Sequence, residues 1–180
     1  MTHHVACWNA LTLKLEETQA LTVHALHQYK VDVACLSEVK LADHGHKSIK
    51  VPLSDAAYHL YYSGPTDGSG RHGVALVLSD QANNALLAWE LVSPCLARVH
   101  LRGALFNISI IAVYTPTLDA DEVTKASFYD RLQAVMDGIS PRDFVVIAGD
   151  FNARTGTVTP ITDILSDHSL SVTAARTESG

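Results

Sequence analysis

Cysteine and basic residues are both scarce in this chain of 180 residues. The three cysteines, Cys7, Cys35 and Cys95, are widely spaced and form no C-x-x-C pair, so neither a disulfide framework nor a zinc ribbon is predicted. With 13 Lys and Arg against 19 Asp and Glu, the formal net charge is −6. This charge argues against binding of nucleic acid through a broad basic face. It is compatible with an enzyme that reaches phosphate through a bound divalent cation, because such a cleft needs acidic residues.

Long apolar runs are also absent. No stretch approaches the roughly 18 consecutive apolar residues of a membrane span, and the first residues lack a basic region followed by an apolar block. We therefore expect no membrane association and an intracellular protein of the nucleus or cytoplasm that is not secreted. The hydrophobic content of 47% is enough for one globular domain over residues 1–180.

The apolar periodicity predicts a mixed α/β (α+β) fold. Strands are predicted at residues 5–9, 31–36, 58–62, 73–79, 96–101, 105–114 and 145–150. Helices are predicted at residues 16–29, with Leu21, Ala25 and Leu26 on one side, and from Asp119 or Asp121 to about 137, with Phe128, Leu132, Val135 and Met136 on its buried face. Two pairs of strands resemble hairpins, which favours a sandwich of mixed sheets with helices outside over a doubly wound parallel sheet.

The segment 145–153 is the most informative part of the chain, because an apolar strand pattern stops abruptly on Gly149-Asp150-Phe151-Asn152. Side chains just past the carboxyl end of a strand commonly line a cleft. A carboxylate and an amide two residues apart can serve one reacting group: Asp150 can accept a proton from water, and Asn152 can donate a hydrogen bond to a developing anion. The pair indicates hydrolysis.

Three further polar residues also follow predicted strands: Asn9, Glu38 and Tyr114. Each alone is at least as compatible with a cap or a turn as with catalysis. Glu38 offers the hard oxygen ligand that Mg²⁺ prefers, and Mg²⁺ often takes only one or two protein carboxylates beside water and substrate phosphate. Near the end of the chain, Asp167 precedes His168, an imidazole that could stabilise or protonate a phosphoryl oxygen. The whole set suits phosphodiester chemistry.

Three other patterns are less informative. The segment 68–73 satisfies G-x-G-x-x-G, but it precedes a strand, so a hairpin turn is predicted and not a dinucleotide site. No G-x-x-x-x-G-K-[ST] sequence occurs, which excludes a P-loop NTPase. The ten histidines occupy mixed contexts and are interpreted as surface or partly satisfied residues.

In combination, these segments resemble the ordered motifs of the endonuclease/exonuclease/phosphatase family, most closely the endonuclease domains of non-LTR (LINE-type) retrotransposons and the craniofacial development protein 2-like proteins. The matching segments are Cys7-Trp8-Asn9, Leu36-Ser37-Glu38-Val39-Lys40, Gly73-Val74-Ala75-Leu76, Ala112-Val113-Tyr114-Thr115-Pro116-Thr117, Gly149-Asp150-Phe151-Asn152-Ala153 and Ser166-Asp167-His168. The resemblance covers nearly the whole chain.

The resemblance implies a four-layer sandwich of two mixed, mostly antiparallel β-sheets flanked by helices, and a Mg²⁺-dependent endonuclease, with Mn²⁺ as a possible substitute, that acts on nucleic acid, foremost DNA. The sequence gives no evident sign of a protein partner. The roles that the resemblance implies are metal binding by Glu38 with Asn9 as neighbour, orientation or deprotonation of the attacking water by Asp150, phosphate binding by Asn152 and Tyr114, and transition-state stabilisation by His168 paired with Asp167.

One departure from the family pattern is internal. Only thirteen residues separate Asn152 from Ser166, whereas the family has several dozen between these motifs. Family strands are therefore expected to be missing between about residues 156 and 163, which leaves a sandwich shortened near the C-terminus. The alternative function is a catalytically weak or inactive remnant of the domain that serves as an interaction module or is an orphan fragment.

Overall fold

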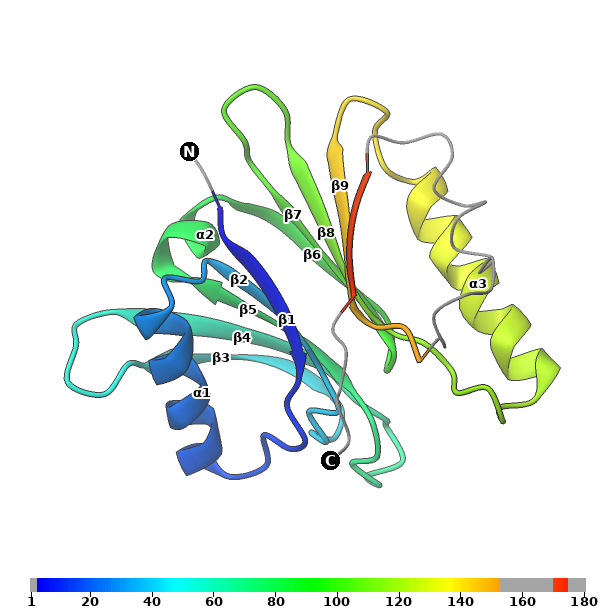
Figure 1. Cartoon of the computed structure of the whole chain (residues 1–180), viewed down its shortest axis with the longest axis horizontal. Helices are drawn as coiled ribbons and strands as arrows, with labels where there is room; N and C mark the ends of the chain where they lie inside the picture. The colour runs from blue at the N-terminus through cyan, green and yellow to red at the C-terminus, as the bar shows by residue number, and fades with distance from the viewer. Residues whose placement is uncertain (1–2, 153–169, 175–180) are drawn as a thin grey trace.

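Two five-stranded sheets pack face to face in the computed structural model, which describes residues 3–152 and the backbone of residues 170–174 (Figure 1). The first sheet has the order β1-β2-β5-β4-β3, with β1 Val5–Asn9, β2 Val33–Ser37, β3 His44–Lys50, β4 Ala57–Ser63 and β5 Val74–Ser79. The second has the order β10-β9-β8-β7-β6, with β6 Leu86–Ser93, β7 Leu96–Leu101, β8 Ile108–Tyr114, β9 Phe144–Asp150 and β10 Leu170–Ala174. The helices are α1 Glu16–Gln28, α2 Asp80–Asn84 and α3 Glu122–Asp137.

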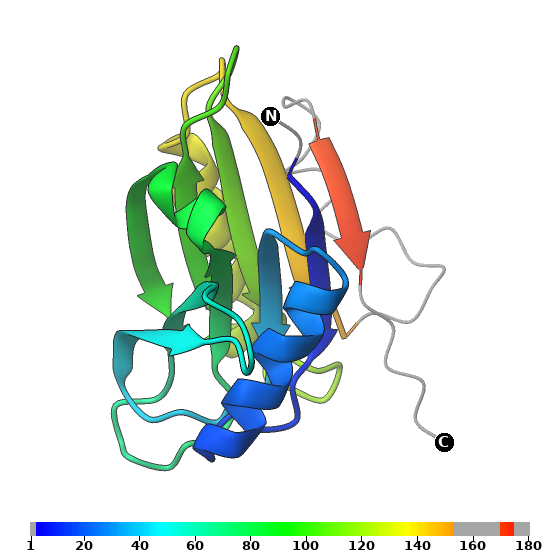
Figure 2. The ribbon, with the colours of Figure 1, turned by 90° about the vertical axis from the view of Figure 1, so that its left-hand side faces the viewer.

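Both sheets are mixed. The pairs β1–β2, β8–β9 and β9–β10 are parallel, and the other neighbouring strands are antiparallel. The long helices α1 and α3 lie on the outer faces of the first and second sheet, which gives four layers (Figure 2). The predicted fold class is confirmed: two mixed, mostly antiparallel sheets flanked by helices.

The unbroken apolar strands are buried on both faces. In β5, Val74, Leu76 and Leu78 pack in the core between the sheets, whereas Val77 belongs to the cluster beneath α1. Successive side chains of a strand point to opposite faces, so a strand covered on both sides needs apolar residues at every position. The same pattern holds for β9, where Val146 and Ala148 face the other sheet and Val145 and Ile147 face α3.

The second predicted helix is confirmed in detail. The Asp121 side chain accepts a hydrogen bond from the Thr124 backbone N–H at 2.8 Å, which identifies Asp121 as the N-cap of α3. The helix ends at Asp137 before the C-cap Gly138. Its buried residues are the four that the periodicity predicts.

The predicted buried side of the first helix is wrong at Leu21, which is 70% exposed. The buried residues of α1 are Gln19, Val23 and Leu26. Five residues advance about 140° around a helix axis, so Leu21 and Leu26 lie on different faces. Gln19 is buried because its side-chain amide donates a hydrogen bond to the Leu13 carbonyl at 2.6 Å.

Four elements are not predicted by the periodicity: β3, α2, β6 and β10. The strands β3 and β6 are the outer strands of their sheets, and most of their residues are exposed or half-buried. Helix α2 has only five residues. Such short or one-sided elements are held by tertiary pairing and carry little periodicity of their own. Among the residues that the structure describes, no helix has the length and apolar character needed to span a membrane.

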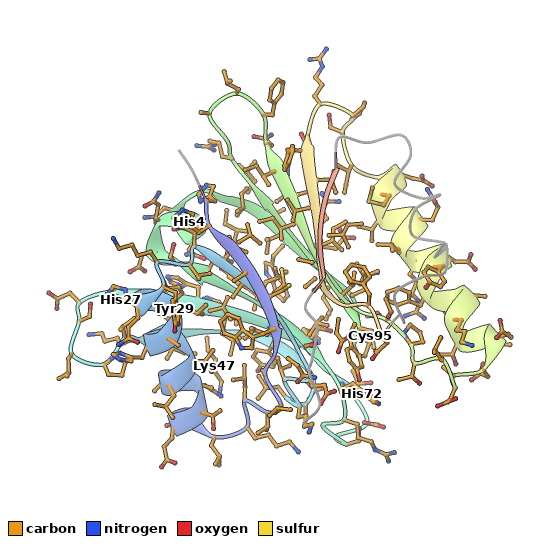
Figure 3. The ribbon with its side chains drawn as sticks, in the orientation of Figure 1. His4, His27, Tyr29, Lys47, His72 and Cys95 are labelled. Atoms are coloured by element: carbon orange, nitrogen blue, oxygen red, sulfur yellow. The ribbon has the colours of Figure 1, made fainter. Side chains whose placement is uncertain are left out.

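Tyr58 makes a buried hydrogen bond that helps to hold the first sheet together. Its buried hydroxyl donates a hydrogen bond to the Val31 carbonyl at 2.8 Å and so ties β4 to the segment before β2. We expect Tyr58→Phe to lower the free energy of unfolding by about 1–3 kcal/mol, because a buried acceptor loses its donor. The measurement is urea unfolding. The matched control is Tyr29→Phe, because Tyr29 follows the last residue of α1 and is 79% exposed (Figure 3). An equal loss of unfolding free energy in both variants would contradict the prediction.

The same residue predicts an alkaline transition. Burial, and then the charges of Asp32 and Asp80, raise the pKa of Tyr58 to about 12. A pKa that is raised in the folded state stabilises the fold below the unfolded pKa, about 10 for tyrosine, and this contribution is lost as the pH rises towards the folded pKa. The wild type should therefore lose stability between about pH 10 and 12 more steeply than Tyr58→Phe.

Candidate active site

The carboxyl ends of β1, β2, β8 and β9 meet at one end of the molecule (Figure 1). Asn9 is the last residue of β1 and pairs with Ser37 at the end of β2. Tyr114 pairs with Asp150 at the ends of β8 and β9. Strands of both sheets thus bring Asn9, Glu38, Tyr114 and Asp150 together, although they are far apart in the sequence.

Glu38 and Tyr114 connect the two sheets. The Tyr114 hydroxyl donates a hydrogen bond to Glu38 Oε1 at 3.4 Å, and these residues follow β2 and end β8. Glu38 has a φ of 54°, so the chain turns sharply as soon as β2 ends. A residue other than glycine in this left-handed conformation costs energy, and such strain is often found at functional sites.

Asp150 and Asn152 form a fixed turn against the end of β8. The Asn152 backbone N–H donates to Asp150 Oδ1 at 3.0 Å, and the Asn152 side-chain amide donates to the Thr115 carbonyl at 2.6 Å. The Thr115 N–H in turn donates to the Asp150 carbonyl at 2.9 Å. These bonds hold the carboxylate and the amide in place before any ligand binds, which is the preorganisation that catalysis requires.

Gly149 permits the close contact of β9 with β8 just before this turn. A Cβ atom at Gly149 would lie 1.9 Å from the Val113 carbonyl oxygen, and the residue has a φ of 150°. No other residue fits there without moving the backbone. The close packing of β9 against β8 therefore explains the glycine of the Gly-Asp-Phe-Asn motif. This packing does not require the polar side chains of Asp150 and Asn152.

The surroundings of this cluster change the pKa of Tyr114. Burial raises the pKa of its phenol, and the negative charges of Glu38 and Asp150 raise the pKa further, against a smaller opposite effect of the Asn152 side chain. The phenol therefore stays protonated at neutral pH and acts as a hydrogen-bond donor. Burial also raises the pKa of the Cys7 thiol, with a smaller contribution in the same direction from the Asp150 charge. Asp150 is thus close to Cys7 as well as to Tyr114.

Asn9 lies at the predicted end of the sheet, but its side-chain oxygen closes a local turn. Asn9 Oδ1 accepts a hydrogen bond from the Leu11 N–H at 2.8 Å. This is the turn role that a single asparagine at a strand end often has. The amide oxygen retains a second lone pair, and the NH₂ group is a donor, so the turn is compatible with a further contact to metal or phosphate.

Beside Glu38 lies a group of cations that the sequence pattern does not predict. Lys14, Lys40 and Arg71 line a cavity of about 390 Å³ that also includes Glu38 and Tyr114. The His72 ring lies 5.6 Å from the Tyr114 ring, and Figure 3 shows His72 at the end of the molecule where these strands finish. Arg71 and His72 belong to the G-x-G-x-x-G segment, which connects the antiparallel strands β4 and β5. The predicted hairpin connection is confirmed.

Asp167 and His168 lie outside the described residues, and so does the segment 156–163 in which family strands are expected to be missing. Beyond them, β10 begins at Leu170, which pairs with Val145 at the amino end of β9. Asp150 is at the other end of that strand. The relation of Asp167 and His168 to Asp150 stays a prediction.

The residues present fit a divalent cation that binds partly through substrate. Among the described residues there is no cluster of three or more His, Cys, Asp or Glu that could hold a metal, so a cage made by protein alone does not fit. Glu38 is a carboxylate with a 27% exposed side chain at the edge of the cavity, and both Glu38 and Asp150 act on Tyr114. One or two carboxylates completed by water and phosphate oxygens are the usual Mg²⁺ site of phosphoryl-transfer enzymes.

Comparison with known proteins identifies relatives of the chain. It is 28% identical over 153 residues to craniofacial development protein 2 of Bos taurus, a match that covers 84% of this chain and 24% of that protein. The chain therefore spans about a quarter of the length of this relative. The endonuclease domain of TRAS1, a telomere-specific non-LTR retrotransposon, has a similar fold, with a TM-score of 0.55, 17% identity and coverage of 85% of this chain and 62% of that one.

A second solved structure, D. rerio TDP2 complexed with a single-strand DNA product, has a TM-score of 0.51 and 12% identity over 89% of this chain and 62% of that one. At these identities the likeness concerns the fold alone. The family model of the endonuclease/exonuclease/phosphatase family matches residues 6–168, which is most of the chain. The chain therefore belongs to the endonuclease/exonuclease/phosphatase family.

Proposed function

We propose that this chain hydrolyses phosphodiester bonds of DNA as a Mg²⁺-dependent endonuclease. The observation that carries the proposal is the junction of the two sheets, where Glu38 contacts Tyr114 and where Asp150 and Asn152 are held against the end of β8. Family membership supports hydrolysis of a phosphodiester. DNA is supported by the fold similarity to a retrotransposon endonuclease domain and to a protein bound to a DNA product.

Asp150 is proposed to orient the attacking water and accept its proton. Its Oδ1 already accepts the Asn152 N–H, and an ionised carboxylate has further lone pairs for a water molecule. A general base must lie within hydrogen-bond reach of the proton that it accepts. The strand end of β9, beside the cavity that begins at Tyr114, is a suitable place for it.

Asn152 and Tyr114 are proposed to hold the phosphate. The protonated phenol of Tyr114 is a hydrogen-bond donor, as its bond to Glu38 shows. Donors aimed at the position where negative charge develops stabilise the transition state. Since its present acceptor is Glu38, the hydroxyl must turn from the carboxylate towards a phosphate oxygen when substrate binds.

Glu38, with Asn9 as neighbour, is proposed to hold the divalent cation, Mg²⁺ or in its place Mn²⁺. The cation would neutralise charge on the phosphoryl oxygens. His168, paired with Asp167, is proposed to donate a hydrogen bond to a phosphoryl oxygen in the transition state. This role is supported by the family resemblance alone, because both residues lie outside the described part of the chain.

The second candidate is a remnant that lacks catalysis and serves as an interaction module. The observation that favours it is length: the two solved structures have 62% of their chains matched here, and the segment between Asn152 and Ser166 is short. A remnant of this kind would keep the fold while its cleft is incomplete.

Plasmid nicking separates the two functions. We expect the purified chain to convert supercoiled DNA to the open circle in Mg²⁺ or Mn²⁺, and to stop when EDTA removes the cation. The control for a contaminating nuclease is an Asp150→Ala protein purified in parallel. Equal, background-level cleavage by both proteins would reject the endonuclease and favour the remnant.

A further inference from the structure

The cavity beside Glu38 concentrates positive charge in an acidic protein. Lys14, Lys40 and Arg71 line it, and Glu38 is the acidic residue among its lining side chains. The chain as a whole carries a formal net charge of −6, so the positive charge around this cavity differs in sign from the charge of the whole protein. Such a group either compensates the charge of nearby carboxylates or binds an anionic ligand.

Backbone contacts bring the three cations together from separate parts of the chain. The Leu13 N–H donates to the Val39 carbonyl at 2.8 Å, and the Lys40 N–H donates to the His72 carbonyl at 2.8 Å. These bonds join the segment after β1, the segment after β2 and the β4–β5 connection. The cluster is therefore fixed by the fold and does not depend on long side chains that meet by chance.

Gly70 lies at the centre of this convergence. A Cβ atom there would be 2.9 Å from the Lys40 carbonyl oxygen and 3.0 Å from Lys14 Nζ, and the residue has a φ of 54°. Glycine thus lets the β4–β5 connection approach both lysine-bearing segments closely. It also places Arg71, the next residue, beside them.

The cations are only weakly compensated. Lys40 Nζ lies 3.9 Å from Glu38 Oε2, with the two side chains 40% and 27% exposed, and exposed pairs at such a distance are weak. Within the described part of the chain, Lys14 and Arg71 form no salt bridge within 4.0 Å. Arg71 acts on Asp67, whose pKa is lowered mainly by hydrogen bonds from Ser69 and less by the arginine. Most of the positive charge is left for a ligand.

We propose that this cluster of Lys14, Lys40 and Arg71 binds the phosphates of a polynucleotide strand next to the phosphodiester that is cleaved. The inference rests on the proposed function. The cavity begins at Glu38 and Tyr114, so a strand whose reacting phosphate lies there continues past the cations. Three cations carry more positive charge than one phosphodiester group, with its single negative charge, can compensate. Lys and Arg contacts to phosphate position a strand without reading its bases, so the substrate is a polynucleotide bound without sequence preference by this cluster.

Salt-dependent DNA binding in EDTA tests the cluster without any cleavage. The probe is a short fluorescent DNA duplex, and anisotropy gives its Kd at several salt concentrations. For Lys14→Ala combined with Arg71→Ala we expect weaker binding and a slope of log K against log salt that is smaller by about 1.8, because each lost phosphate contact removes about 0.9.

The matched control combines Lys47→Ala with Arg142→Ala, which removes the same charges elsewhere. Lys47 lies on β3, away from His72 in Figure 3, and Arg142 precedes β9 at the end opposite Asp150. This control should keep the wild-type slope. A wild type that does not bind the duplex, or equal slopes in both double variants, would overturn the proposal.

Two further measurements distinguish phosphate binding by the cluster from catalysis. Thymidine monophosphate at the same phosphate concentration should not displace the duplex; if it does, the cavity takes small phosphoesters and the proposal is wrong. If the wild type binds with the full slope but does not nick DNA in Mg²⁺, the cluster is supported and the endonuclease function fails.

Discussion

Asp150→Asn is expected to lower the nicking rate by about 10²- to 10⁴-fold, the range for loss of a general acid or base. Asparagine has the shape of aspartate, and its Oδ1 can still accept the Asn152 N–H that Asp150 accepts at 3.0 Å. The turn at the end of β9 is therefore kept. What is removed is the negative charge and with it the ability to take a proton from water.

The rate is measured as initial nicking of supercoiled DNA at saturating Mg²⁺. Asp130→Asn, an exposed residue of α3, makes the same chemical change away from the site and should leave the rate within a factor of two or so, as surface substitutions usually do. Thermal unfolding of both variants should match the wild type. If Asp150→Asn retains the wild-type rate while wild-type nicking depends on Mg²⁺, then Asp150 is not the base.

The sequence predicts best those elements that are buried on both faces. β5 and β9 carry unbroken apolar runs because each is covered by a helix and by the other sheet, and α3 has both an N-cap and a four-residue buried face. The elements that escape prediction have a different origin. β3 exists because it pairs with β4 over seven positions, while its own residues are mostly exposed and polar. Hydrogen bonds to a distant partner leave no periodicity in the strand itself.

The site divides in the same way. Asp150 and Asn152 are two residues apart, so a local argument about one strand end finds both. The Glu38–Tyr114 contact joins residues 76 positions apart. Their shared place after predicted strands and the resemblance to the family group the two residues, but the contact itself depends on how the two sheets pack. The cation cluster has no such aid, because it depends on the meeting of three segments around Gly70, which no local pattern encodes.

Glu38→Gln is expected to weaken Mn²⁺ binding by about 100-fold or more. Loss of a residue that only orients a metal ligand already weakens metal binding by about 10- to 100-fold, and Glu38 is proposed to be a ligand itself. The reason is electrostatic, since Mg²⁺ and Mn²⁺ are held by hard, charged oxygens. Glutamine keeps the length of the side chain and an oxygen that can accept the Tyr114 hydroxyl. The lost contact to Lys40, at 3.9 Å, contributes little to stability.

Isothermal titration with Mn²⁺ measures this affinity directly and needs no activity. Glu122→Gln is the matched control, because the Glu122 side chain is 89% exposed on α3, where its Oε1 lies 3.0 Å from Lys125 Nζ. This variant should bind Mn²⁺ as the wild type does. In nicking assays, Glu38→Gln should need a much higher Mg²⁺ concentration for half-maximal rate.

The titration also decides between the two candidate functions at the level of binding. Saturable wild-type binding that Glu38→Gln removes would place the cation at the junction of the two sheets and support the endonuclease. Weak binding that is the same in wild type, Glu38→Gln and Glu122→Gln would instead mean that the cleft holds no specific cation. The fold would then retain the strand ends of the family, with Glu38 in place, but without a bound cation to polarise a phosphodiester. Hydrolysis would be absent because the cleft around Glu38 does not complete a cation site.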